Sequence, residues 1–426
     1  MSNKTLTVAI LGCGNRGADI YGTIMYEMPE KFKITALCDI NEIKLDRAGT
    51  QFGVPKDMRF STENEFFAQR RSDLIVIATL DADHVRQALR ALELGYDIML
   101  EKPITDKIDE CEALLAAQKR YGGKIFVCHV LRYSPAFTEC AKILDSGELG
   151  KLVAVQATEE VAYWHQAHSF VRGNWRNREE TAPMILAKCC HDLDLLQYYA
   201  KSACKTVSSV GDLAYFKPEN APDGATARCI ECPHASTCPY SAIRLYMDDW
   251  KNRGRPYWIW PQATISDSRP LTEAAIEKAL RDGPYGRCVY ACDNDVVDHQ
   301  LCNFVFENGV KASLLMTAFT ANGGRIIKFC CTLGELVLDE ENGFINIKPF
   351  GKPQRTLNFT DFCGNVGGGH GGGDRGLIMS IYAALNGETA AGVTSLENSI
   401  ESHLMAIRAE QSRLSGGKTL AVHEKQ

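Results

Sequence analysis

A glycine-rich hexamer near the start of the chain has the residue types that cradle phosphates. Gly12-Cys13-Gly14-Asn15-Arg16-Gly17 follows an apolar run and precedes a helical pattern over residues 18–27. In a dinucleotide site the first glycine makes the tight turn, the second lets the backbone approach a pyrophosphate, and the third lets helix and strand pack closely. The helix N-terminus then offers unpaired N–H groups to the phosphates. The spacing alone is weak evidence, because an ordinary turn between a strand and a helix also fits it.

Asp39 strengthens the dinucleotide interpretation. The second apolar run ends in Thr-Ala-Leu-Cys-Asp, so Asp39 follows the glycines at the distance expected of a ribose-binding acid. A carboxylate there accepts hydrogen bonds from the adenosine ribose hydroxyls and repels a 2′-phosphate. The sequence therefore favours NAD over NADP, although Arg16 would soften that preference.

Candidate site residues, most of them polar, also end or follow the next three apolar runs. They are Ala78, Thr79 and His84 after the third run, Glu101 and Lys102 after the fourth, and His129, Arg132 and Tyr133 after the fifth. Because ligands of open α/β sheets bind at the carboxyl ends of the strands, we expect these residues to face one crevice. Lys102 would also fit a solvated loop lysine, but Pro103 stiffens the strand exit and fixes where the lysine points.

The ordered set GCGNRG, LCD, ATLDADH, EKP and H-x-x-R resembles the Gfo/Idh/MocA oxidoreductases, from residue 5 to about residue 415. The resemblance implies a nicotinamide cofactor and a hydride exchanged with a carbon of a sugar or cyclitol. It implies that Lys102 assists proton transfer and that His191, in an H-x-x-D pattern, is the acid/base. A buried core histidine would also fit His191. The residues expected at the cofactor are Gly12, Gly14, Asn15, Arg16, Gly17, Asp39, Ala78, Thr79, His84, Glu101 and Lys102.

The chemistry of a secondary alcohol explains why a lysine and a histidine suit this reaction. Hydride removal leaves a hydroxyl proton, which a neutral imidazole accepts near physiological pH. A nearby ammonium stabilises the developing alkoxide. Many family members carry an aspartate four residues before the histidine, but this chain has Ala187 there, followed by Lys188. The pattern over residues 184–200 predicts one helix, on which Lys188 shares the face of His191, so Lys188 either enters the site as a third catalytic group or extends outward to solvent.

Aromatic and hydrogen-bonding residues gather in two further stretches, at 163–177 and 367–374. Flat rings beneath C–H faces together with polar donors are typical of sugar sites. The six glycines of the second stretch would permit a mobile lid. An exposed structural loop is the alternative for both. The residues expected at the substrate are Arg132, Tyr163, His165, His168, Arg172, Trp175 and His370.

Three cysteines, Cys229, Cys232 and Cys238, have the spacing C-x₂-C-x₅-C. A fourth ligand would come from Cys288 or Cys292, and the resemblance to relatives with the same insertion favours Cys288. Four thiolates suit structural Zn²⁺, and an iron–sulfur cluster uses the same set. Free thiols or a disulfide are the remaining alternative. We expect a metal that stabilises the insertion and takes no part in hydride chemistry.

The elements that must position these residues fall into two domains. Short apolar runs, such as residues 97–100, alternate with helical patterns, such as residues 108–121, over residues 1–131, which predicts a doubly wound parallel sheet that binds NAD. Residues 132–415 have longer strands, an Asn308-Gly309 hairpin signal and closing helices, which predicts an α+β domain with a large, mostly antiparallel sheet for substrate binding and oligomerisation. Residues 217–300 interrupt the strand pattern and are expected to form an insertion. Residues 416–426 are expected to be a polar, mobile tail.

Composition excludes several other classes of protein. The 426 residues are 45% hydrophobic and 23% charged, with a formal charge of −6, which argues against binding to nucleic acid or an anionic membrane. No apolar run is long enough for a membrane span, and no signal peptide is apparent. Seventeen cysteines without a signal indicate free thiols in the cytoplasm.

The sequence leaves three functions open. The first is an NAD-dependent dehydrogenase acting on a secondary hydroxyl of a sugar, glycoside or cyclitol. The second is a glycosidase that oxidises its substrate transiently, eliminates the glycosidic bond and returns the hydride. The third is a cofactor-sensing regulator, which the presence of both Lys102 and His191 argues against. The resemblance also implies a homodimer or homotetramer, because the open face of the second sheet needs a partner.

Overall fold

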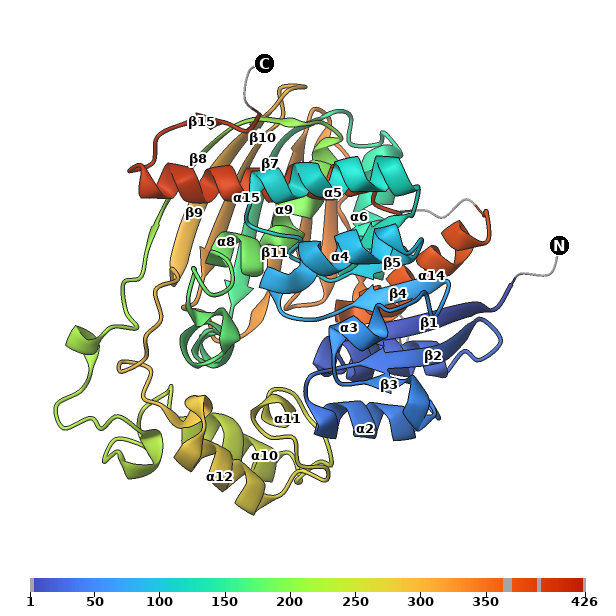
Figure 1. The fold of residues 1–426 in the computed structure, drawn as a ribbon. Coiled ribbons are helices and arrows are strands. Elements are labelled where there is room, and N and C mark those ends of the chain that lie inside the picture. The colour runs from blue at the N-terminus through green and yellow to red at the C-terminus, as the bar shows by residue number, and fades with distance from the viewer. Residues whose placement is uncertain (1–3, 363–369, 389–391, 424–426) are drawn as a thin grey trace.

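The computed structural model describes residues 4–362, 370–388 and 392–423. It is an α/β structure with a six-stranded sheet near the N-terminus and a nine-stranded sheet in the second part of the chain (Figure 1). This agrees with the fold class that the sequence predicts. Within the described ranges, no helix combines the length and the apolar character needed to cross a bilayer.

The six-stranded sheet is parallel throughout and has the order β3-β2-β1-β4-β5-β6. Its strands are β1 (Leu6–Leu11), β2 (Phe32–Cys38), β3 (Arg59–Phe60), β4 (Leu74–Ile77), β5 (Asp97–Leu100) and β6 (Ile125–Val127). Every residue of β4 is buried, because helices cover both faces of the sheet. The strand order reverses between β1 and β4, which places a ligand crevice at the carboxyl ends of these strands.

The helices that cover this sheet come from both ends of the chain. Those of the first part are α1 (Thr23–Tyr26), which continues a π-helical segment Asn15–Gly22, α2 (Glu42–Gln51), α3 (Glu63–Phe66), α4 (His84–Glu93) and α5 (Ile108–Tyr121). From the C-terminal part, α14 (Gly373–Leu385) buries Leu377 and Ile381 in the core of one face. On the other face, α15 (Leu396–Leu414) buries Leu396 and Ile400. The chain therefore returns to its first sheet after building the second.

The nine-stranded sheet has the order β14-β13-β12-β11-β7-β10-β9-β8-β15, and β7 with β10 is its one parallel pair among the described residues. Its strands are β7 (Leu152–Val161), β8 (Cys204–Asp212), β9 (His299–Phe306), β10 (Lys311–Thr317), β11 (Gly323–Cys331), β12 (Gly334–Asp339), β13 (Phe344–Pro349), β14 (Arg355–Asn358) and β15 (Leu420–Ala421). Gly309, at φ +89°, turns the chain between the antiparallel strands β9 and β10. This confirms the predicted hairpin.

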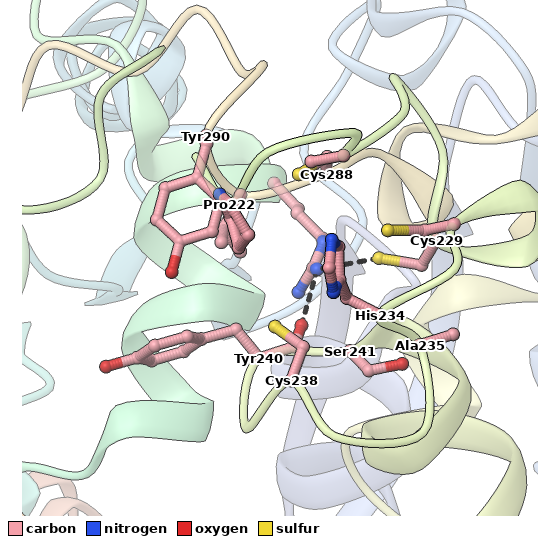
Figure 2. A pocket seen from close by; sticks show the side chains of 13 residues that line it. Pro222, Cys229, His234, Ala235, Cys238, Tyr240, Ser241, Cys288 and Tyr290 are labelled. Carbon is pink, nitrogen blue, oxygen red and sulfur yellow. Dashed lines mark hydrogen bonds between the residues drawn. The ribbon is translucent and has the colours of Figure 1, made fainter. Parts of the chain in front are cut away.

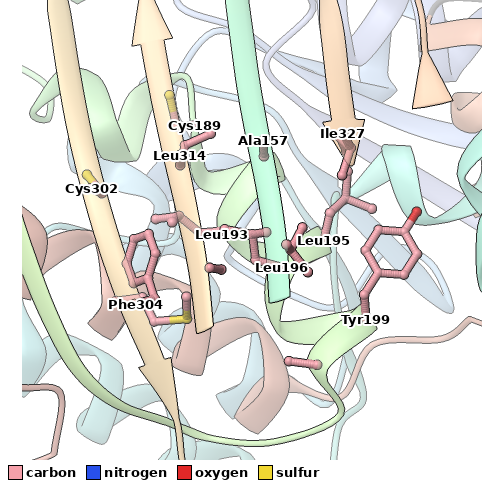
Figure 3. Packing of buried hydrophobic residues seen from close by; sticks show 14 of the residues in the cluster. Ala157, Cys189, Leu193, Leu195, Leu196, Tyr199, Cys302, Phe304, Leu314 and Ile327 are labelled. Carbon is pink, nitrogen blue, oxygen red and sulfur yellow. The ribbon is translucent and has the colours of Figure 1, made fainter. Parts of the chain in front are cut away.

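Helix α9 (Cys190–Ala200) packs on one face of the nine-stranded sheet, where Leu193 and Leu196 lie against Ala157, Leu314 and Phe304 (Figure 3). The same core takes residues from α6 (Pro135–Asp145), α8 (Met184–Ala187) and α15. The prediction of a single helix over residues 184–200 is thus wrong in one respect. It breaks between α8 and α9, so the residues on either side of the break do not share one helical face.

The predicted insertion leaves the sheet between β8 and β9 and carries α10 (Asp249–Asn252), α11 (Gln262–Ile265) and α12 (Glu273–Asp282). Where the insertion joins the sheet, Asp298 holds its two ends together by accepting hydrogen bonds from the N–H groups of Ala214 and Tyr215. The insertion has small cores of its own and extends to the first sheet (Figure 1). There Asp267 accepts a 3.1 Å hydrogen bond from the Asn41 side chain, two residues after Asp39.

The end of the chain differs from the expected mobile tail. Leu420 and Ala421 form β15, which pairs with Val207 and Thr206 of β8, and Val422 is buried. Apolar side chains that follow two glycines anchor this segment at the edge of the sheet.

Candidate functional site

The glycines of the first turn have three different environments. Gly12 has φ +95°, and a Cβ there would lie 2.4 Å from the Ala78 carbonyl oxygen. A Cβ on Gly17 would lie 1.9 Å from the Gly12 carbonyl oxygen, so these two glycines are required by backbone packing. A Cβ on Gly14 would meet nothing within 4 Å, and no side chain caps the helix that follows. The turn therefore leaves room beside Gly14 for a phosphate, next to uncapped helical N–H groups.

Asp39 lies directly beside this turn. Its Oδ2 accepts a 2.6 Å hydrogen bond from the Cys13 N–H, and its Oδ1 accepts one of 2.7 Å from the Asn41 N–H. The carboxylate is only partly buried. It is therefore held at the end of β2 with its orientation fixed by the backbone, where a ribose would reach it.

His84 connects the loops that follow β4 and β5. Its Nδ1 lies 2.7 Å from the Pro103 carbonyl oxygen and its Nε2 lies 3.3 Å from the Thr79 carbonyl oxygen. The Thr79 hydroxyl donates to Gln87 of α4. Because both nitrogens of the buried ring face backbone carbonyls, His84 braces these two loops.

Arg16 joins the glycine turn to the loop after β5 and to α14. Its Nε lies 2.7 Å from Glu101 Oε1, and its Nη2 lies 2.7 Å from Asp374 Oδ1 and contacts the Tyr21 hydroxyl. Burial by itself would raise the pKa of Glu101, but Arg16 and Lys102 together lower it. Both carboxylates thus stay charged and neutralise Arg16. This weakens Arg16 as a partner for a 2′-phosphate.

Lys102 reaches from the first domain to the second. Its Nζ donates a 3.1 Å hydrogen bond to the carbonyl oxygen of Ala187, at the end of α8. His191 is buried in the first turn of α9, and its Nδ1 has no hydrogen-bond partner among the described residues. Burial first, and the positive charge of Lys102 second, lower the pKa of His191 well below 6.5. The imidazole is therefore neutral near pH 7 and has a nitrogen available to accept a proton.

Lys188 lies in the break between α8 and α9 and belongs to a buried ionic network. Its Nζ lies 3.0 Å from Glu159 Oε1, and Glu159 Oε2 lies 2.6 Å from Arg325 Nη2. Arg325 Nε in turn lies 2.8 Å from Asp192 Oδ1. Burial raises the pKa of Asp192 to about 7 despite Arg325. Lys188 thus neither extends freely to solvent nor follows the face of His191.

Sequence reasoning missed Glu159 and Arg325, which are direct cross-strand neighbours on β7 and β11. One signal was available, because Glu159 continues the inward-facing register of Val155, Ala157 and Val161. A carboxylate in a buried strand register requires a cationic partner.

Two of the expected substrate residues lie near Lys102 or His191. The His370 ring centroid lies 5.8 Å from that of His191, and His370 Nδ1 lies 3.2 Å from Asp374 Oδ2. His165 packs between Trp164 and Trp260 of the insertion, and burial followed by Lys188 lowers its pKa well below 6.5. The glycines at 367–369 lie outside the described residues.

Tyr163 and Trp175 lie at the edges of this region. The Tyr163 ring packs edge-on against Tyr240 of the insertion, 5.9 Å between centroids. Trp175 Nε1 donates a 3.1 Å hydrogen bond to Asp81 Oδ2 in the loop after β4. Trp175 thus ties the second domain to the cofactor side of the first.

The other three residues expected at the substrate are used within the fold. Their contacts are Arg132 with Asp194 at 2.6 Å, His168 with the Tyr246 hydroxyl at 2.8 Å, and Arg172 with the carbonyl oxygens of Arg287 and Tyr240 at 2.7 Å each. All three side chains are buried. Because most of their polar atoms contact protein partners, the structure gives no support to substrate binding by these three residues, which stays a prediction.

The four candidate metal ligands come together, but without the arrangement of a metal site. Cys229, Cys232, Cys238 and Cys288 line one cavity of about 20 Å³ in the insertion (Figure 2). Arg172 lines it too, with Nη2 3.5 Å from Cys229 Sγ. In the part of the chain that the structure describes, no group of three or more His, Cys, Asp or Glu side chains is placed to hold a metal ion, and the cysteines are free. The expected zinc or iron–sulfur centre is not supported, because the Arg172 guanidinium, which is itself a cation, lies next to the thiols.

Comparisons with known proteins identify the family of the chain. A sequence profile described as "Oxidoreductase family, NAD-binding Rossmann fold" matches residues 6–129, and one described as "GFO/IDH/MocA C-terminal domain" matches residues 137–230. The chain belongs to the Gfo/Idh/MocA oxidoreductase family. Within this family it is an enzyme of the dehydrogenase type with an NAD-binding Rossmann domain.

Relatives and solved structures extend the comparison. The putative oxidoreductase YteT of Bacillus subtilis is 22% identical over 84% of each chain. The inositol 2-dehydrogenase of Rhodococcus erythropolis is 29% identical over 36% of this chain and 44% of its own length. The WlbA dehydrogenase of Bordetella pertussis, solved with NADH and UDP-GlcNAcA, has a TM-score of 0.67 at 15% identity and is covered over the full length of both chains. That last likeness shows the fold alone.

Proposed function

We propose that this Gfo/Idh/MocA protein is an NAD-dependent dehydrogenase that oxidises a secondary hydroxyl of a sugar, glycoside or cyclitol. One observation carries the proposal. The structure brings Lys102, at the end of β5, to the break before α9, where it contacts Ala187 and depresses the pKa of His191. An ammonium and a neutral imidazole from two domains thus meet on the ligand side of the glycine turn.

The residues around the first turn fit a bound dinucleotide. The open space beside Gly14 and the uncapped helix would take the pyrophosphate, and Asp39 would take the adenosine ribose. Asp39 and the neutralised Arg16 favour NAD over NADP. When bound, NAD supplies the hydride acceptor. The name of the inositol 2-dehydrogenase relative supports a cyclitol or sugar as the hydride donor.

Lys102 and His191 then divide the proton chemistry. The Lys102 ammonium donates a hydrogen bond to the substrate hydroxyl oxygen and stabilises the negative charge that develops there. His191, neutral and without a partner for Nδ1, accepts the hydroxyl proton. Trp164 and Trp260 lie beside His165 and offer flat apolar faces to a sugar ring.

A panel of sugars, glycosides and cyclitols tests this function. The purified protein with NAD is expected to form NADH with at least one member of the panel. Lys102→Met, which keeps the length of the side chain and removes its charge, is the matched control and should form none at the same enzyme concentration. An absence of turnover with every alcohol would reject the dehydrogenase function.

One observation favours the second function that the sequence leaves open. The His370–Asp374 pair places a second imidazole 5.8 Å from that of His191. A transient ketone acidifies the adjacent C–H, and a second base would remove that proton before elimination. A relative with 22% identity is named 2,7-anhydro-N-acetylneuraminate hydratase, from Mediterraneibacter gnavus. Release of a sugar from a glycoside without net NADH would identify this reaction.

We also propose that two copies associate through the open face of the nine-stranded sheet. Val210, Leu301, Leu315, Thr158 and Ile326 are successive cross-strand neighbours from β8 to β11. The four apolar members are exposed, including Leu301 at 42% and Val210 at 53%. A row of four exposed apolar side chains and one threonine across five strands favours a second copy of the same sheet as its cover. The free thiols fit a reducing compartment, which supports a location in the cytoplasm.

A further inference from the structure

Two short motifs of the sequence meet behind the catalytic pair. His129 and Arg132 follow β6, while His191 and Asp194 lie in α9. Arg132 binds both oxygens of Asp194, with Nε 2.6 Å from Oδ2 and Nη2 2.8 Å from Oδ1. This buried ion pair fixes the end of β6 against α9. As a result the rings of His129 and His191 face each other edge to face, with centroids 6.2 Å apart.

His129 is buried, and among the described residues neither of its ring nitrogens has a hydrogen-bond partner. The neighbouring His403, 5.8 Å away between ring centroids, shows the usual state of a structural histidine. Its Nδ1 lies 2.7 Å from the Ser399 carbonyl oxygen, and its Nε2 accepts a 2.8 Å hydrogen bond from the Ile104 N–H. Burying a ring with two unpaired nitrogens lowers the free energy of unfolding, so packing alone does not explain why a histidine stands at this position.

The charges around the two rings differ. His191 faces the cations Lys102 and Arg325 and the imidazoles of His370 and His129, all of which oppose a proton on its ring. His129 Nε2 lies 3.9 Å from the Asp194 carboxylate. A proton leaving His191 therefore moves toward a negative charge when it reaches His129.

The remaining charged groups near His129 come from the adjacent loops. Arg132 and Lys102 oppose a proton on the ring, while Glu101 and Asp194 favour it. Burial has the largest effect and lowers the pKa of His129 below 6.5, so the ring is neutral at rest and able to accept a proton near pH 7.

We propose that His129 is a positioning residue that relays the substrate proton away from His191. The relay rests on the proposed dehydrogenase function. The hydroxyl proton passes to His191 while the carbon that bears this hydroxyl gives up its hydride, for which NAD would be the acceptor, so the alcohol becomes a ketone. His191 then transfers a proton to His129, directly after a ring rotation or through one water, and regains its neutral form. Asp194 stabilises the resulting imidazolium at position 129 until the proton returns in the reverse reaction or exchanges with solvent.

Two variants of the full-length chain test the relay. His129→Phe fills the same space without nitrogens, and His129→Gln keeps polar atoms without a titrating ring. The partly exposed His299 on β9, whose Nδ1 lies 2.9 Å from Asp298 Oδ1, gives the matched control His299→Gln. The first measurement follows the ring of His191 by NMR in ¹⁵N-histidine-labelled protein during a pH titration, and it needs no substrate. Both His129 variants are expected to raise the pKa of His191, because His129 opposes its protonation, while the control leaves it unchanged.

The second measurement is the pH profile of kcat with the alcohol found in the panel. Both His129 variants should lower kcat by about tenfold, less than the roughly 10²- to 10⁴-fold contribution of a general base, and should shift the acid limb of the profile. NADH affinity should stay at the wild-type value. An unchanged His191 titration in either stable variant, or a loss of NADH binding with no change in that titration, would overturn the relay. If the wild type oxidises no alcohol, the proposed function fails, and the NMR titration still decides whether the two rings are coupled.

Discussion

His191 shows how the surroundings of one residue decide its chemistry. Buried among cations and imidazoles, it stays neutral at a pH where a solvated histidine is partly charged. Lys102 contributes to this effect and also supplies the ammonium that a developing alkoxide needs. Each residue thus makes the other more effective, and both depend on the contact between β5 and α8 that Lys102 makes with Ala187.

His191→Asn is expected to lower kcat for alcohol oxidation by about 10²- to 10⁴-fold, because the proton acceptor is lost. The base works only when neutral, and its folded-state pKa lies below 6.5. The wild-type kcat should therefore stay constant through neutral pH and fall only at pH values well below 6.5. Steady-state rates across a pH series check this. A wild-type acid limb centred above pH 7 would contradict the assignment.

At the residue scale, the sequence predicts the groups that local patterns fix and misses those that long-range register fixes. Gly12, Gly17 and Lys102 stand in short motifs whose geometry follows from a strand and the turn after it. Glu159 meets Arg325 only because β7 and β11 pair in one particular register, which no local pattern specifies. The same limit explains Arg172, whose partners lie in the insertion.

The glycine turn after β1, which is proposed to bind the cofactor, has one glycine that the fold requires, Gly17, and one that only the cofactor would require, Gly14. Gly17→Ala should destabilise the protein by about 3 kcal/mol or more, because its Cβ would overlap the Gly12 carbonyl oxygen at 1.9 Å. Gly14→Ala should leave the melting temperature unchanged and weaken NADH binding, because its Cβ enters the space beside the turn. Thermal unfolding and NADH titration of both variants check this pair. A Gly14→Ala protein with wild-type NADH affinity would place the pyrophosphate elsewhere.

The insertion depends on Arg172 as a structural residue. Arg172→Met should lower the free energy of unfolding by about 2–4 kcal/mol, because it leaves the buried carbonyls of Arg287 and Tyr240 without their donor. Arg253→Met, which removes an exposed pair with Asp249, is the control and should cost less than about 1 kcal/mol. Denaturant unfolding monitored by tryptophan fluorescence measures both. Equal stability of the two variants would show that Arg172 does not hold the insertion together.

At the element scale, the predicted strands and helices agree with the structure wherever periodicity is strong, as in β5 and α5. The expected helix over 184–200 fails at Lys188 and Cys189, because the contact with Glu159 outweighs helical continuation. Composition alone also does not reveal that Val422 is buried and that β15 completes the sheet edge. Tertiary contacts decide each of these cases.

The whole molecule is held together by helices that cross between its parts. Helix α14 buries its apolar face on the first sheet, while α15 packs with Leu396 and Ile400 on the first sheet and with Met405 and Ala406 in the core of the second (Figure 1). A boundary placed at residue 131 therefore separates the strands of the two sheets but not their cores. The sequence does not reveal this sharing of cores, because both helices have generic apolar faces, which do not specify the sheet that they cover.

The open face of the nine-stranded sheet makes a prediction for assembly. Leu301→Arg places a charge in the middle of the exposed apolar row and should convert the oligomer to monomers. Sedimentation velocity at several concentrations measures the change. Lys311→Arg on the same sheet is the matched control, since it keeps a cation at an exposed position outside the row. A wild-type protein that is monomeric at all concentrations would reject this interface.

The central claim is that hydride leaves a carbon whose hydroxyl contacts Lys102 and His191. An alcohol from the panel, deuterated at that carbon, tests it in one turnover with NAD and wild-type, Lys102→Met or His191→Asn protein. Mass spectrometry of the reduced cofactor should find the deuterium with the wild type, at a rate about a hundredfold or more above either variant. Reduced cofactor without deuterium, or equal rates of transfer in all three proteins, would contradict the claim.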